Sequence, residues 1–157
     1  MTETKTTESL YDRLGGAFAI AAVVDRFSDQ LIVNSKVGKG SKNKQLNEWS
    51  TNKLDRLPGL KFMRTLWVCD IAGGPQKFAP TKAEPSRLNL QNAHCPFQIN
   101  SDEFDEVAKE LANALDYFHV PEKEKNEVLA AFKTHKSEVT EGSKSKFCPF
   151  INIPPLT

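Results

Sequence analysis

The sequence predicts an all-α fold. Apolar residues recur at intervals of three and four along several separate stretches, the pattern of helices with one buried face. Two Gly-Gly pairs, at 15–16 and 73–74, interrupt these stretches. The sequence shows no strand pair, heptad array or internal repeat. Its length of 157 residues fits one domain.

Two helices are expected on either side of the first glycine pair. A glycine inside a helix costs about 1 kcal/mol relative to alanine, so the pair predicts a sharp corner between a short helix and a longer one. The residues predicted to face inward are Leu10, Leu14, Phe18, Ala21, Ala22, Val24, Phe27 and Leu31.

The middle of the chain alternates between polar connections and one helix. Residues 34–53 are rich in Lys, Asn, Ser and Gly and predict a loop in which Trp49 is the one aromatic anchor. A helix is expected from Leu54 until the second glycine pair, with Pro58 in its first turn. Residues 76–93 contain two prolines and predict an extended connection.

Two further helices are predicted in the last third. Ser101 is the expected N-cap of the first, whose buried stripe is Phe104, Val107, Ala108, Leu111, Leu115 and Phe118. Pro121 opens the last helix, whose inward residues are Val128, Leu129, Phe132 and Val139. The apolar tail from residue 143 to 157 contains three prolines, so it cannot prolong that helix.

The composition limits which kinds of binding partner and which cell compartment are expected. Lys and Arg number 21 against 20 Asp and Glu. A net charge this close to zero does not indicate binding to nucleic acid or to an anionic membrane. The polar start lacks a signal peptide, and no apolar run could span a membrane. The cysteines, Cys69, Cys95 and Cys148, are read as reduced thiols. A cytoplasmic protein is expected.

Among the three histidines, His94 stands out because it lies in a loop before a helix and has apolar neighbours such as Phe97 and Ile99. Such an imidazole either bonds to backbone or binds a metal, and spacing alone favours the first reading. Cys95 is either a redox-active thiol or a small apolar side chain. Motifs of common hydrolases and nucleotide-binding proteins are absent.

Three segments carry a family resemblance. They are SLYDRLGGAFAIAAVVDRF at 9–27, DIAGGPQKF at 70–78 and QNAHCPFQINSDEFDEVAKELANAL at 91–115. Each resembles the corresponding part of group I truncated haemoglobins, and the resemblance covers residues 9–142. It implies a two-over-two helical sandwich with an extended loop before the proximal histidine. Residues 1–8 are then a polar N-terminal tail, and 143–157 a C-terminal tail.

The resemblance implies haem b, with His94 as the iron ligand. The residues expected to contact the haem are Trp49, Leu57, Leu60, Arg64, Trp67, Phe97 and Leu111. Arg64 could hydrogen-bond a bound ligand or pair with a haem propionate, and the propionate is slightly preferred. Ser28 stands where the family commonly has a ligand-binding tyrosine, so a tyrosine-anchored oxygen cage is not expected.

Other ligands and other functions remain open at this point. Lys53, Lys61 and Met63 are candidates for an internal sixth iron ligand. The leading hypothesis is binding of a diatomic gas (O2, NO or CO), used for transport, sensing or NO dioxygenation with an external reductant. The alternative is a globin-like interaction subunit that docks on a reductase or another protein through its C-terminal tail, with haem unused or absent.

Overall fold

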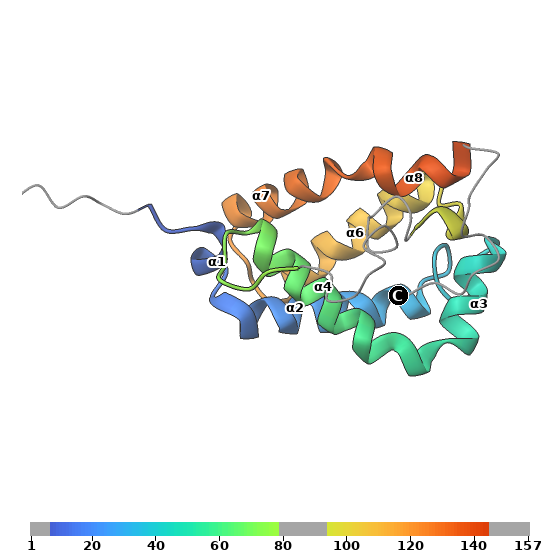
Figure 1. Ribbon diagram of the computed structural model, residues 1–157, viewed down its shortest axis with the longest axis horizontal. Coiled ribbons are helices and arrows are strands. Elements are labelled where there is room, and N and C mark those ends of the chain that lie inside the picture. Colours follow the sequence, from blue (N-terminus) through green and yellow to red (C-terminus); the bar gives the residue numbers. More distant parts are fainter. Residues whose placement is uncertain (1–6, 79–93, 145–157) are drawn as a thin grey trace, which may run out of the picture.

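The computed structural model describes residues 7–78 and 94–144, and within these ranges it is helical without strands (Figure 1). The all-α prediction is confirmed. The α-helices are α1 (Leu10–Arg13), α2 (Gly16–Val33), α3 (Lys44–Asn52), α4 (Leu57–Ile71), α6 (Ser101–Tyr117), α7 (Glu122–Lys133) and α8 (Lys136–Lys144). Two 3-10 helices are η1 (Leu54–Arg56) and η3 (Cys95–Phe97).

The longer helices form two packed pairs. Helix α2 packs against α4, and α6 packs against α7 and α8. The pairs meet where α2 crosses α6, and Figure 1 shows α7 and α8 on the opposite side of the molecule from α2 and α4. This is the predicted two-over-two arrangement. The short helix η3 rests on α8 and α3.

The first glycine pair forms the predicted corner between α1 and α2. Gly15 and Gly16 have φ angles of 97° and 83°, a left-handed conformation that favours residues without a side chain. The second pair touches this corner, since a Cβ on Gly74 would lie 2.5 Å from the Tyr11 ring. Tyr11 N also donates to Ala72 O at 2.9 Å. The two corners therefore close one end of the fold together.

The predicted loop at 34–53 is partly wrong, because residues 44–52 form helix α3. The side chain of Asn43 starts it by accepting hydrogen bonds from the backbone N–H groups of Gln45 and Leu46. Trp49 is only 7% exposed and belongs to the main core cluster. A polar helix with so narrow an apolar stripe resembles a loop in composition, and burial of its one indole stabilises it.

Asn100, and not the predicted Ser101, caps α6. The Asn100 side chain accepts from Glu103 N at 2.8 Å, and Glu103 Oε1 accepts from Asn100 N at 3.0 Å, a capping box. Asn43 Nδ2 donates to the same carboxylate and to Phe97 O, at 3.2 and 2.8 Å. These bonds join the starts of α3 and α6 to η3, the turn that follows His94.

The predicted last helix is two helices. Pro121 precedes α7 as expected, but the helix ends at Lys133 and α8 begins at Lys136. Thr134 Oγ1 donates to Ala131 O at 2.6 Å, and such a bond competes with regular helical bonding. Because His135 lies in this break, its side chain points in a different direction from the one that a continuous helix would give it.

Two residues of the predicted buried stripes are exposed. Phe18 is 94% exposed and Phe118 is 40% exposed. On α2 the buried face is set by Ile20, Val24 and Phe27, and Phe18 lies two residues before Ile20, on the opposite side of the helix. Phe118 is the C-cap of α6 and lies at its rim.

The reduced-thiol prediction is wrong at one cysteine. Cys69 is a free thiol with no exposed surface, and burial raises its pKa. Cys95 is disulfide-bonded. The interpretation of Cys95 as a redox-active free thiol is therefore wrong, and the cysteines no longer support a reducing compartment. Cys148 and most of the predicted connection at 76–93 lie outside the described residues.

Candidate functional site

A cavity of about 240 Å³ lies between the two helix pairs. About 10–15 Å³ of such volume is enough for one water molecule, so this cavity is large enough to admit a ligand. Aliphatic and aromatic side chains of α2, α3, α4, α6 and η3 supply most of the wall. The polar side chains in the wall are Ser28, Ser50, Arg64, His94 and His135.

His94 enters the cavity wall from the residue before η3. Its backbone is held by a turn in which Pro96 and Phe97 are buried and Gln98 takes a left-handed conformation with φ of 50°. Helix α8 packs so closely on this turn that a Cβ on Gly142 would lie 2.6 Å from Cys95 Cα. The imidazole therefore stands on a short, tightly supported segment.

Six of the seven residues predicted to contact a cofactor line this same cavity. They are Trp49, Leu60, Arg64, Trp67, Phe97 and Leu111. The seventh, Leu57, is not part of the wall and packs behind it against the core cluster that contains Trp49 and Leu60. Folding thus collects residues from four helices around His94.

Among the described residues, Arg64 is the one that brings a guanidinium to the cavity wall. Its Nη1 donates to Ser28 Oγ at 3.0 Å, and its Cζ lies 5.4 Å from the ring centroid of Phe27. Ser28 has no exposed surface. Burial lowers the pKa of Arg64 to about 10, which leaves the group charged at neutral pH. The cavity therefore contains a positive charge held by a neutral hydroxyl.

His135 is a cavity residue that the sequence did not single out. Its ring lies 5.0 Å from that of Trp67, and its Nδ1 is 3.0 Å from Glu138 Oε1. A continuous last helix gave no reason to place it here, and its neighbours Lys133 and Lys136 indicate a solvated face. The signal that could have found it is Thr134, a residue prone to interrupt helices.

The three candidates for an internal sixth ligand differ in position. Met63 lines the cavity, whereas Lys53 is the C-cap of α3 and is not part of the wall. Lys61 Nζ lies 2.6 and 2.7 Å from carboxylate oxygens of Asp25 and Asp29. Burial alone would lower the pKa of Lys61, but the two carboxylates together raise it. A protonated amine has no lone pair for a metal.

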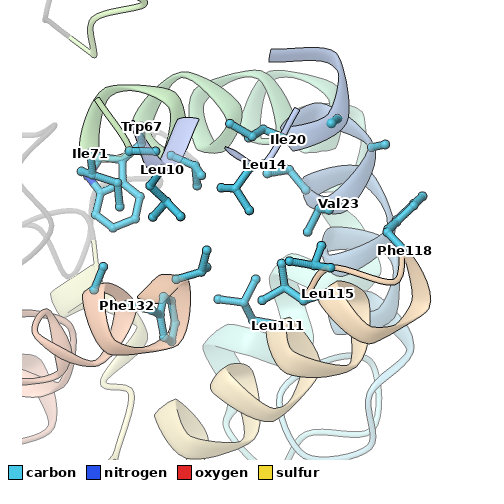
Figure 2. Close-up of a pocket in the computed structure, with 18 residues that line it drawn as sticks. Leu10, Leu14, Ile20, Val23, Trp67, Ile71, Leu111, Leu115, Phe118 and Phe132 are labelled. Carbon is cyan, nitrogen blue, oxygen red and sulfur yellow. The ribbon is translucent and has the colours of Figure 1, made fainter. Parts of the chain in front are cut away.

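A second cavity, of about 220 Å³, adjoins the first. Figure 2 shows Trp67 and Ile71 on one side of it and Phe132 and Leu111 on the other. Five residues line both cavities: Val24, Trp67, Val68, Leu111 and Phe132. Its wall is formed by apolar side chains, so it suits only small apolar molecules.

Comparison with known families decides the identity of this helical unit. Residues 9–141 match the family described as Bacterial-like globin. The chain belongs to the bacterial-like, truncated globin family. Globin homologues bind haem, and the cavity described above occupies the space between the helix pairs of this globin.

Solved structures show the same fold. The globin superposes on the 2/2 haemoglobin of Synechococcus sp. PCC 7002, a structure with covalently attached haem, with a TM-score of 0.67 and 21% identity over 85% of this chain and 99% of that one. For a variant of the truncated haemoglobin of Tetrahymena pyriformis the TM-score is 0.66, at 18% identity over 84% and 97%. The haemoglobin of Chloroflexus aurantiacus gives a TM-score of 0.63 and 21% identity, over 84% of this chain and 97% of that one.

A search of curated proteins finds no match to this globin. Within residues 7–78 and 94–144, none of the helices combines the length and apolar character needed to cross a membrane.

Proposed function

We propose that this globin binds one haem b in the 240 Å³ cavity, with His94 as the iron ligand, and that it binds a diatomic gas on the other face of the haem. The haem supplies an iron that coordinates the gas. Residues 9–142 are the haem-binding unit, and the segments at 9–27 and 70–78 favour assignment to group I.

The observation that carries this proposal is the position of His94 in a largely apolar wall shared with Arg64 and Trp67. Helix α4, which bears Arg64 and Trp67, packs against α2, whereas η3 packs against α8. The imidazole and the α4 side chains thus reach the same cavity from different layers. Apolar walls and two indoles suit a flat apolar ring.

Haem reconstitution tests the assignment of His94. The protein should take up about one equivalent of haemin, and the ferrous form should show a Soret band that shifts on addition of CO. His94→Gly should lose haem, and added imidazole should restore it by replacing the missing ligand. An unchanged variant would contradict the ligand assignment.

His119 offers the matched control. It is an exposed histidine at the end of α6 with φ of 57°, and it is absent from the cavity wall. His119→Asn suits that conformation, since asparagine tolerates the left-handed region. The variant should bind haem and CO as the parent does.

The use of the bound gas is addressed by ligand kinetics. Oxygen dissociation should be fast, because Ser28 cannot place a tyrosine hydroxyl on the ligand. NO dioxygenation would additionally require an electron donor outside this chain. Consumption of NO by the oxygenated protein with a supplied reductant would support detoxification, and slow autoxidation with reversible oxygen binding would support transport.

A further inference from the structure

Within residues 7–78 and 94–144, Arg64 differs from the cations that form ion pairs in having no carboxylate partner. Arg13 is paired with Glu124 and Glu127, and Lys61 with two aspartates. Among the residues that the structure describes, the hydrogen bond to Ser28 is the one polar contact found for the Arg64 guanidinium. A guanidinium has five N–H donors, so most of its donor capacity remains for a ligand.

The direction of the guanidinium separates two roles. Its partner Ser28 lies on α2, has no exposed surface, and lines the same cavity as His94. Haem propionates are hydrated carboxylates and favour the solvent edge of a pocket. Arg64 itself is half-buried, but its guanidinium is fixed to a fully buried hydroxyl and is therefore directed into the cavity and away from the solvent edge. Of the two roles open to Arg64, this direction favours contact with an iron ligand over pairing with a propionate.

The charge determines the class of ligand. A positive group in a wall of low polarity gains most from a ligand that carries a compensating negative charge. CO stays neutral when bound to ferrous iron and offers only a weak hydrogen-bond acceptor. The cavity of about 240 Å³ must also hold the haem, which leaves room for a ligand of only a few atoms.

Resting on the proposed haem site, we infer that Arg64, held in place by Ser28, makes this cavity a receptor for small monovalent anions bound at ferric iron. Azide is a suitable probe, and nitrite and hydrosulfide belong to the same chemical class. Ser28 is a positioning residue, since its hydroxyl acts through the guanidinium.

Parallel titrations of ferric protein with azide and of ferrous protein with CO test this inference. CO is a neutral ligand of similar size and serves as the internal control. Arg64→Met should raise the azide Kd roughly 10- to 100-fold, the size of a hydrogen bond to a charged group, with much less change in the CO Kd. Arg64→Lys should restore part of the azide affinity because it keeps the charge. Ser28→Ala should give a smaller loss than Arg64→Met.

Several results would overturn the inference. Equal changes for azide and CO in Arg64→Met would show an effect of cavity shape, and an unchanged azide Kd would show no contact. Faster haem loss to an apoprotein acceptor, with the azide Kd unaltered, would assign Arg64 to the propionates. Failure of the parent protein to take up haem would instead contradict the proposed function, so the two failures are distinguishable.

Discussion

The indole ring of Trp67 and the imidazole ring of His135 meet edge to face, with centroids 5.0 Å apart and an interplanar angle of 69°. Trp67 lies on α4, and His135 lies in the break between α7 and α8. The contact therefore joins the two helix pairs across the cavity wall. Aromatic pairs in this geometry contribute roughly 0.5–1.5 kcal/mol beyond their buried area.

Both tryptophans of the chain, Trp49 and Trp67, line the proposed haem cavity. Haem absorbs at the wavelengths at which indole emits, so a haem in this cavity should quench most of the intrinsic tryptophan fluorescence. Titration with haemin should show quenching that saturates at one equivalent. Trp67→Phe should leave the weaker emission of Trp49, and that emission should also be quenched. Persistent bright emission in the haem-loaded protein would place the haem elsewhere.

Arg64 should destabilise the protein when no haem is bound. A charge with one neutral partner in a largely apolar wall is costly, and replacing it with an apolar side chain of similar length removes that cost. The double variant Arg64→Met, Ser28→Ala removes both partners of the hydrogen bond and should raise the free energy of unfolding by about 1–3 kcal/mol. Arg64→Lys, measured by the same urea titration, should show no such gain. A less stable double variant would contradict this account.

Two glycine-to-alanine substitutions should act in opposite directions. A Cβ at Gly142 would lie 2.6 Å from Cys95 Cα and O, so Gly142→Ala must push α8 away from η3 and should cost about 1–3 kcal/mol. It should also weaken haem retention, because η3 directly follows His94. Gly59, in α4, has nothing within 4 Å of its Cβ position, and Gly59→Ala should stabilise by about 0.5–1 kcal/mol. Thermal unfolding of both variants tests whether Gly142→Ala lowers the stability and Gly59→Ala raises it.

The ion pair between Arg13 and Glu127 should make stability depend on pH. Arg13 Nη1 and Nη2 donate to the two carboxylate oxygens at 2.8 and 2.7 Å, and these bonds hold the pKa of Glu127 below its ordinary value of 4.5. The unfolded chain then binds more protons than the folded protein over the interval below pH 4.5. The contribution is fully present above that pH and is lost as the pH falls through the folded-state pKa.

Thermal midpoints of the parent and of Glu127→Gln should therefore differ by a constant amount above about pH 5 and converge below it. The same comparison made in an Arg13→Gln background is the control, because the cycle isolates the pair. In the Arg13→Gln background, the effect of Glu127→Gln on the thermal midpoint should not depend on pH. A difference that persists unchanged in acid would show that Glu127 acts through something other than this ion pair.

The sequence predicted the helical class and both glycine corners. Gly15 and Gly16 carry local information, because a left-handed backbone is cheap for glycine and costly for other residues. It also placed His94 at a turn. The prediction failed for α3, where a polar segment folds around Trp49, and at His135, where a helix break depends on one threonine bond.

The sequence by itself determined that the fold is helical, where the chain turns sharply at the glycine pairs, and which histidine merits attention, since these depend on spacing and backbone preference over a few residues. Only the tertiary structure decided that Arg64 turns toward Ser28, that Lys61 turns toward Asp25 and Asp29, and that His135 faces Trp67. Each of these contacts joins residues 32 or more positions apart in the sequence. Such partners are chosen by packing and by the need to satisfy buried polar groups, which a local pattern does not encode.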